Sequence, residues 1–121
     1  MSESKKDIRR RKKQVKERKE QDKKDRKTRG KKGYCTRDTF GFDTYLAGVI
    51  AGGVKELRDR QFGVPSNIEE EEWNTILDKI ALGFAKYAVD SDGGMHFGYE
   101  KEPEFIEAMQ LFQEYFPALW D

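Results

Sequence analysis

Large apolar side chains are nearly absent from the N-terminal part of the chain and frequent in the rest. From Ser4 to Lys32 almost every residue is Lys, Arg, Glu, Asp or Gln, and the large apolar exceptions are Ile8 and Val15. From Tyr34 onward, apolar residues recur at spacings of three and four, which is the period of an amphipathic helix. The pattern therefore predicts a charged N-terminal segment without a core, followed by a helical body.

The first apolar stripe of the body predicts a helix over roughly residues 42–60. Gly48, Gly52 and Gly53 fall inside it, where each glycine costs about 1 kcal/mol relative to alanine. They therefore require either close packing against another helix or a local break, and we expect a kink near Gly52. The stripe consists of Phe42, Tyr45, Leu46, Val49, Ile50, either Gly53 or Val54, and Leu57.

The second helix has a start signal in the sequence. Ser66 follows Pro65, and Glu69 lies three residues after Ser66, which is the spacing of a capping box. The acidic run 69–72 fills the first turn, where the positive end of the helix dipole stabilises carboxylates. Turn-forming residues at 90–94 predict the end of this helix. Its apolar positions are Trp73, Ile76, Leu77, Ile80, Phe84 and Tyr87.

A third helix is predicted from Pro103, which suits a first helical turn, to Pro117, which stops the helix. The preceding residues 95–101 alternate between apolar and polar side chains. Because they have no second strand to pair with, we expect a loop that lays its aromatic side chains over the core. The stripe of the third helix is Phe105, Ile106, Met109, Phe112 and Phe116.

These elements predict an all-α fold, with a compact three-helix domain over residues 34–121 and a basic tail over residues 1–33. The tail is rich in helix formers and in oppositely charged pairs spaced by four residues. Isolated helices are marginal in water, so the tail is expected to be a nascent helix or disordered, ending near Gly30 and Gly33.

Charge divides the chain at nearly the same place. Residues 1–38 contain 18 of the 24 Lys and Arg but 7 of the 23 Asp and Glu, so a segment of net charge +11 precedes one of net charge -10. Blocks of like charge determine which partners a protein attracts. The two segments are therefore expected to bind partners of opposite sign.

The basic tail predicts non-specific contact with nucleic acid or a nucleoprotein complex. Clustered cations bind phosphates by releasing condensed counterions, and the tail has no aromatic residue before Tyr34 to stack on bases. A solubilising tail, or one that docks on the acidic body, is an equal alternative. The candidate binding residues are Arg9, Arg10, Arg11, Lys12, Lys13, Lys16, Arg18, Lys23, Lys24 and Arg26.

The acidic body suggests an alternative function as a protein-interaction module or inhibitor. Its carboxylates would dock on a basic host or viral protein, and a solvated acidic surface is the simpler explanation of the same residues. Phe97, Tyr99 and Trp120 would offer an exposed aromatic contact. The candidate acidic residues are Glu69, Glu70, Glu72 and Glu104.

The sequence contains no set of catalytic residues, so we predict a non-enzymatic protein without a cofactor or metal. His96, the one histidine, lies in a Gly-rich stretch without a neighbouring Cys. Cys35 has no base partner and is interpreted as an incidental cysteine at a flexible junction. Asp90 and Asp92 resemble the start of a calcium loop, but Lys101 stands where that loop requires glutamate.

A single cysteine is typical of a reducing compartment, and the N-terminus lacks the apolar region of a secretory signal. No apolar run approaches the roughly 20 residues that span a bilayer. We therefore expect a cytoplasmic protein that does not enter a membrane. The sequence leaves the oligomeric state open.

Two stretches of the body form a recognisable pattern. One is residues 39–43 with Leu46, Ala47 and Ile50, and the other is residues 71–73 with residues 76–80 and Phe84. The pattern resembles small uncharacterised proteins encoded by bacteriophages and prophages. The resemblance implies a helical fold and a viral or mobile-element origin, and it supplies no activity. With the charge division, it leads to the hypothesis of a phage-type accessory protein in an infected or lysogenic bacterial host.

Overall fold

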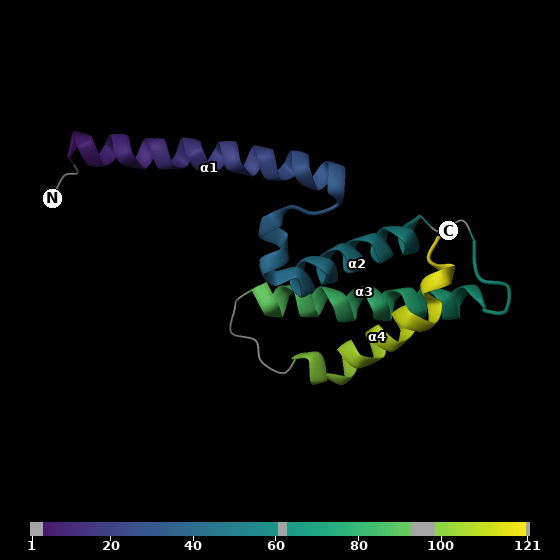
Figure 1. The fold of residues 1–121 in the computed structure, drawn as a ribbon. Coiled ribbons are helices and arrows are strands. Elements are labelled where there is room, and N and C mark those ends of the chain that lie inside the picture. The colour runs from purple at the N-terminus through teal and green to yellow at the C-terminus, as the bar shows by residue number, and fades with distance from the viewer. Residues whose placement is uncertain (1–3, 61–62, 93–98, 121) are drawn as a thin grey trace. The chain divides into compact units, whose positions relative to one another are not determined.

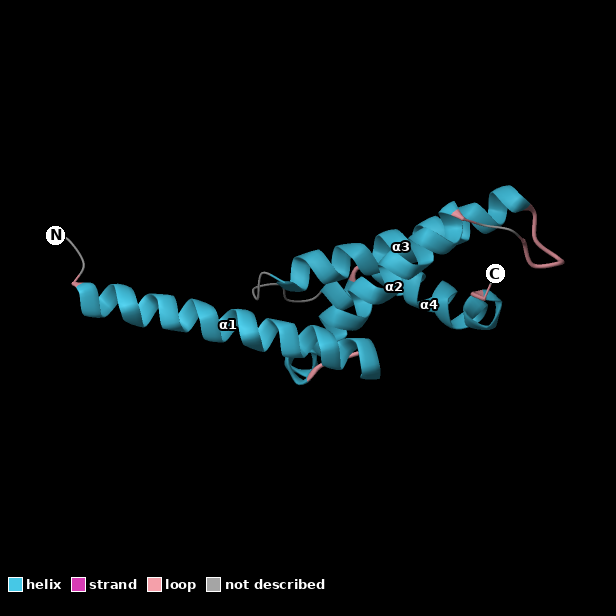
Figure 2. Ribbon diagram, turned by 90° about the horizontal axis from the view of Figure 1, so that it is seen from above, coloured by secondary structure: helices cyan, strands magenta, loops and turns pink. Residues whose placement is uncertain are grey.

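The protein is built from helices, as Figure 1 and Figure 2 show. The computed structural model describes residues 4–60, 63–92 and 99–120, with the backbone alone for residues 90–92. These residues form four α-helices and three short 3-10 helices, and none of them lies in a strand. The predicted all-α fold is confirmed. The chain divides into two compact units, Met1–Gly41 and Phe42–Asp121.

The first unit contains α1, Lys5–Lys32, and the 3-10 helix η1, Thr36–Gly41. Both ends of α1 are capped. Ser4 Oγ accepts the backbone N–H three residues later at 3.1 Å, and Gly33, at φ 86°, donates its N–H to the Arg29 carbonyl oxygen at 2.7 Å. No residue of α1 is buried, so caps and charges support this helix rather than packing. Its predicted end near Gly33 is confirmed.

The second unit contains α2, Phe42–Asp59, α3, Glu70–Asp92, and α4, Pro103–Tyr115. The 3-10 helices η2, Tyr99–Lys101, and η3, Phe116–Ala118, flank α4. These bounds confirm the predicted helix over 42–60 and the predicted start at Pro103. α3 packs against both α2 and α4, whereas α2 and α4 share few contacts. α3 is therefore the central helix of this unit.

One hydrophobic core joins α2, α3 and α4. Leu77 and Ile80 of α3 are fully buried, and Trp73 and Phe84 extend the buried side of the same helix. Small side chains on the neighbouring helices allow close approach to these large ones. The buried residues contributed by the neighbours are Ala47, Ala51 and Val54 of α2 and Phe105 and Ala108 of α4.

α3 and α4 approach closely at Gly83. A Cβ added to this glycine would overlap the Cβ of Ala108 and lie 3.0 Å from the Glu104 carbonyl oxygen. One residue later, the ring of Phe84 packs edge-on against Phe105 with centroids 5.5 Å apart. The methyl group of Ala108 and the backbone of α4 at Glu104 therefore occupy the space that any side chain at Gly83 would need.

Tyr87 links α3 to the start of α2 and to an aromatic cluster. Its hydroxyl donates a hydrogen bond to the Asp43 carboxylate, which raises the pKa of Tyr87 to about 12 and lowers the pKa of Asp43. The ring stacks on Phe105 at 4.6 Å and lies 5.9 Å from that of Tyr99, which is buried. The predicted aromatic cover of the core is confirmed for Tyr99, and residues 95–98 lie outside the described residues.

The predicted capping box at Ser66 is wrong. α3 begins at Glu70, directly after Glu69 and one turn later than the capping box requires. The intervening residues form a turn in which the Ile68 N–H donates to the Pro65 carbonyl oxygen at 3.1 Å. Serine and asparagine favour turns as well as caps, and here the turn forms. The acidic first turn of the helix is confirmed.

The glycines of α2 are not explained by close packing. The helix is continuous over Phe42–Asp59, and open space lies where a Cβ would be at Gly48, Gly52 and Gly53. The expectation of close packing is therefore wrong at these positions, and the kink near Gly52 stays a prediction. Gly83, rather than a glycine of α2, is where two helices need a missing side chain.

The apolar stripe predicted for the third helix is only partly buried. Phe105 is buried and Phe112 is half-buried, but Ile106, Met109 and Phe116 are 42%, 43% and 62% exposed. α4 therefore carries more apolar surface than α3 covers. The buried side of this helix is completed by residues that the predicted stripe omitted, Ala108, Leu111 and Tyr115.

Replacing glycine by alanine should change the free energy of unfolding in opposite directions at Gly83 and Gly48. Gly83→Ala should lower the free energy of unfolding by about 1–3 kcal/mol, because α4 must move to admit the methyl group. Gly48→Ala should raise it by about 0.5–1 kcal/mol, because the helix gains propensity and the new methyl group meets open space. Urea unfolding followed by circular dichroism measures both. Equal effects at the two sites would contradict the packing described for Gly83.

Candidate nucleic-acid interface

Seven cationic side chains follow one another along one side of α1. Their positions alternate by four and three residues, which keeps them on one face of a helix. All seven are exposed, and no acidic residue falls at any of these positions. We refer to this set as the cationic stripe: Lys5, Arg9, Lys12, Lys16, Lys19, Lys23 and Arg26.

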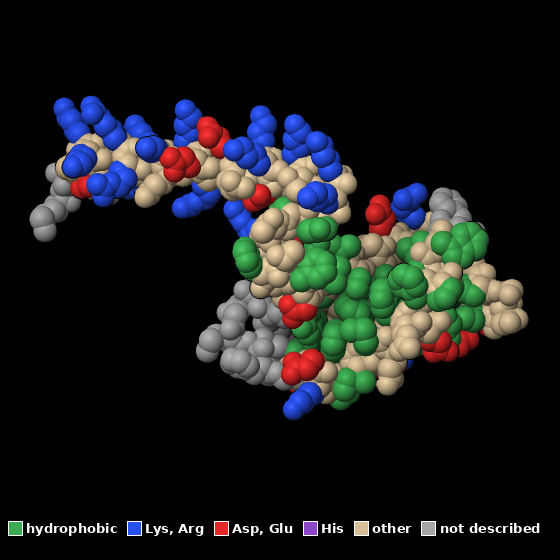
Figure 3. Space-filling model, in the orientation of Figure 1, with side chains coloured by type: hydrophobic (Ala, Val, Ile, Leu, Met, Phe, Trp, Pro, Cys, Tyr) green, Lys and Arg blue, Asp and Glu red, His purple; other side chains and the backbone are tan. Residues whose placement is uncertain are grey.

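Four of the five acidic residues of α1 lie away from the stripe, and Glu20 lies at its edge. At about 100° per residue, Asp7 and Asp25 fall nearly opposite the stripe, whereas Glu20 lies one turn after Lys16 and borders a hollow that stripe lysines line. Glu17 and Asp22 fall to either side of the stripe. Arg37 of η1 forms ion pairs with Asp22 at 3.2 Å and with Asp25 at 3.3 Å. Because its guanidinium offsets both carboxylates, the positive potential near the C-terminal part of the stripe is preserved. Figure 3 shows how densely the Lys and Arg side chains cover α1.

Two shallow hollows adjoin the stripe. The first, of about 390 Å³, is lined by four stripe lysines together with Val15 and Glu20; the lysines are Lys12, Lys16, Lys19 and Lys23. The second, of about 590 Å³, is lined by five cationic side chains and by the two carboxylates that pair with Arg37. A concave surface with several cations can hold phosphate groups by charge, without the fixed geometry that base recognition needs.

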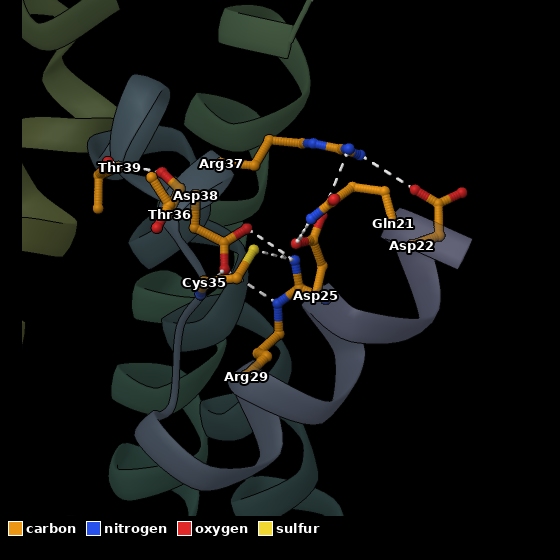
Figure 4. Close-up of polar contacts among 9 residues, drawn as sticks. All are labelled: Gln21, Asp22, Asp25, Arg29, Cys35, Thr36, Arg37, Asp38 and Thr39. Atoms are coloured by element: carbon orange, nitrogen blue, oxygen red, sulfur yellow. Dashed lines mark hydrogen bonds and ion pairs between the residues drawn. The ribbon is translucent and has the colours of Figure 1, made fainter. Parts of the chain in front are cut away.

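η1 is held at the end of α1 by one carboxylate, as Figure 4 shows. Arg29 donates from Nε to Asp38 Oδ2 at 2.9 Å and from Nη2 to Asp38 Oδ1 at 2.8 Å. The same Oδ2 accepts the Cys35 N–H at 2.8 Å, and Arg29 Nη2 lies 3.3 Å from Cys35 Sγ. We call this arrangement the Arg29–Asp38 clamp. A bidentate pair fixes orientation as well as distance.

The clamp depends on the ionised form of Asp38. The hydrogen bonds from Arg29, assisted by the Cys35 N–H, hold the pKa of the Asp38 carboxyl well below its ordinary value of 3.8. A depressed pKa contributes stability that is fully present above 3.8 and is lost as the pH falls toward the folded-state value. The clamp is therefore intact at neutral and mildly acidic pH.

The structure places half of the predicted cations on the stripe and distributes the rest around α1. Sequence reasoning emphasised the densest run, residues 9–13, but consecutive residues wind around a helix and do not share a face. Lys5 and Lys19 were missed, although the alternation by three and four would have found them. On the stripe are Arg9, Lys12, Lys16, Lys23 and Arg26, and on other faces are Arg10, Arg11, Lys13, Arg18 and Lys24.

The predicted acidic residues do not form one surface. Glu69, Glu70 and Glu72 lie at the start of α3, whereas Glu104 lies in the first turn of α4. Glu104 pairs at 2.7 Å with Lys86, which lies about 24 Å along α3 from Glu70. The structure therefore brings three of the four candidates together and leaves Glu104 at the other end of α3.

The remaining candidates have separate environments. Trp120 is 79% exposed, whereas Tyr99 is 5% exposed, so the prediction of Tyr99 as an exposed aromatic contact is wrong.

Cys35 is buried and held by the clamp rather than lying in a loose junction. His96 and Phe97 lie outside the described residues. Within the described residues, no three His, Cys, Asp or Glu side chains are placed to hold a metal ion.

No protein-family model, curated protein or solved structure matches the chain. The resemblance to phage and prophage proteins therefore stays a prediction. In the part of the chain that the structure describes, no helix combines the length and apolar content needed to cross a membrane.

Asp38 should stay ionised at a pH where an ordinary aspartate is half protonated. In an NMR titration, its carboxyl carbon should show little change down to pH 3.8, because Arg29 holds the pKa lower. In the Arg29→Gln variant the same resonance should titrate closer to the ordinary value of 3.8, because the main cause of the depressed pKa is removed. A normal titration of Asp38 in the unmodified chain would contradict the clamp.

Proposed function

We propose that α1 is a nucleic-acid-binding arm that contacts the phosphate backbone through the cationic stripe. The observation that carries the proposal is the run of seven cations on one face of a capped helix, which has Glu20 at its edge. A cationic face binds phosphates by releasing their counterions, and this term supplies most of non-specific affinity. The protein is accordingly a non-enzymatic accessory protein of nucleic acid or of a nucleoprotein complex.

The composition of α1 supports binding without sequence recognition. Its sequence contains no aromatic residue to stack on bases, and Gln14 and Gln21 are its only side-chain amides. Gln21 already donates a hydrogen bond to Asp25 at 2.9 Å. Lysine outnumbers arginine on the stripe, and lysine binds phosphate as a point charge rather than as a bidentate fork. The preferred ligand is therefore a phosphate backbone of any sequence.

The dimensions of α1 are compatible with this ligand. A helix of 28 residues is about 42 Å long and about 10–12 Å wide, and the major groove of B-DNA is about 12 Å wide. Both a duplex groove and an extended single strand could therefore follow the stripe over its whole length.

We further propose that residues 42–120 form a compact three-helix domain behind the basic tail. The shared core of α2, α3 and α4 supports this division, as does the change of charge sign near residue 38. A phage or prophage origin, with action in the bacterial cytoplasm, belongs to the proposal through the resemblance alone.

Two quadruple variants with the same change in net charge test the stripe. Lys12, Lys16, Lys19 and Lys23 are replaced by Gln in the first, and Lys6, Arg10, Lys13 and Lys24, which occupy other faces of α1, in the second. Fluorescence anisotropy with mixed-sequence DNA and RNA oligonucleotides is measured over a salt series. The stripe variant should lose about tenfold or more in affinity, and its log–log salt slope should fall by about 3.

The control variant should retain most of the affinity and of the salt slope. Circular dichroism verifies that both variants keep the helicity of the unmodified chain. Equal losses in the two variants would show that total charge matters and the stripe does not. Undetectable binding of the unmodified chain at low salt would refute the proposed function itself.

A further inference from the structure

η1 carries the most exposed large apolar side chain of the described residues. Phe40 is 84% exposed, and it belongs to the first unit, together with the helix that carries the cationic stripe. Single exposed apolar side chains are common on protein surfaces and need no partner. What distinguishes Phe40 is its position relative to the cations of α1.

Phe40 lies close to the C-terminal end of the cationic stripe. Residues three apart in a 3-10 helix eclipse one another, so Phe40 lies one turn beyond Arg37 on the same face of η1. Arg37 reaches from η1 to two carboxylates of α1, as Figure 4 shows, and it lines the hollow of about 590 Å³ together with three cations of the stripe. One turn of a 3-10 helix rises about 6 Å, so the aromatic ring stands next to this cationic hollow.

Hydrogen bonds hold η1 in place beneath the ring. The Arg29–Asp38 clamp ties the start of η1 to α1, and the Thr39 hydroxyl donates to the Thr36 carbonyl oxygen at 2.6 Å. The Asp38 N–H donates to the Cys35 carbonyl oxygen at 3.0 Å. A ring that is already exposed on a fixed support loses little conformational freedom when a flat ligand stacks on it.

We propose that Phe40 is a base-stacking residue, and that the ligand of the cationic stripe is single-stranded nucleic acid. This inference rests on the proposed function, and it names the class of nucleic acid, which α1 alone does not select. The backbone of the strand lies along the stripe and passes the hollow at Arg37, and a base of the strand stacks on the Phe40 ring. Stacking accepts any base, because every base has a π-face. The contact therefore adds affinity without sequence recognition.

An exposed ring beside cations favours a single strand over a duplex or a lipid surface. Charge alone would favour the duplex, which carries one phosphate charge per about 1.7 Å of its axis, against about 3.4 Å for each strand. The ring adds a contact that a duplex cannot use without unstacking its base pairs. A helix that binds a membrane surface needs an apolar face, and α1 has Ile8 and Val15 as its only large apolar residues.

Fluorescence anisotropy of the full chain with three oligonucleotides of equal length tests the inference. They are a mixed-sequence single strand, the same strand paired with its complement, and an abasic single strand that keeps the phosphates and lacks the bases. Phe40→Leu should lower the affinity for the mixed-sequence single strand about fivefold or more, because the base loses its aromatic partner. The affinities for the duplex and the abasic strand should stay the same, as should the salt slope, because no charge is removed.

Two control variants separate stacking from other effects of the substitution. Phe40→Tyr keeps an aromatic ring and should bind all three oligonucleotides like the unmodified chain. Trp120→Leu removes an aromatic side chain of the second unit that is 79% exposed, and it should change none of the affinities. Circular dichroism verifies that each variant is folded, which the exposure of both positions favours.

Three results would overturn the inference: equal affinity of the unmodified chain for the abasic and the mixed-sequence single strands, an unchanged single-strand affinity in Phe40→Leu, or an equal loss in that variant for all three oligonucleotides. Each of them leaves binding of phosphates by the stripe, and with it the proposed function, intact. Undetectable binding of all three oligonucleotides at low salt would refute both, whether or not the chain binds anionic phospholipid vesicles.

Discussion

α3 supplies the contact on which the rest of the second unit depends. Both neighbouring helices pack on it, and Leu77 and Ile80 at its centre are fully buried, while α2 and α4 contribute small residues toward it. Because each neighbour has α3 as its main packing partner, each keeps apolar side chains that stay exposed among the described residues of the unit. α4 approaches α3 closely at Gly83, but this contact does not bring α4 closer to α2.

The second unit depends on packing, whereas the first unit buries almost no side chains and depends on interactions between charges. Helical winding separates α1 into a mainly cationic face, with Glu20 at its edge, and faces where acids are interspersed. η1 then places Arg37 against Asp22 and Asp25, and the Arg29–Asp38 clamp fixes the turn that brings it there. A short connection therefore adjusts the electrostatics of a long helix, because it supplies one cation, Arg37, to the side where the helix has two carboxylates.

The sequence predicted most of the helices, because their signals are local and repeated. The stripe from Phe42 to Leu57 and the proline at the start of α4 each specify an element without tertiary information. Predictions failed where two local signals compete. Ser66 suits both a cap and a turn, and the residues around it decide for the turn. The burial of α4 also could not be predicted, since Ile106 and Phe105 are equally apolar and packing on α3 alone decides between them.

The sequence indicates that the N-terminal segment carries a cationic candidate site, but it does not directly show which face of the helix carries that site. Residues 9–13 are the densest cations in the chain, yet their side chains radiate from the helix, whereas the more widely spaced Lys16, Lys19 and Lys23 share a face. The net charge of the whole chain is an equally poor guide to how strongly α1 would attract phosphates. Lys5 and Arg26 lie about 32 Å apart along α1, which is about three Debye lengths at 0.1 M salt. A strand bound as we propose would therefore sense, at each point, the few charges of the stripe nearest to it, and a formal charge of +1 for the whole chain does not argue against that binding.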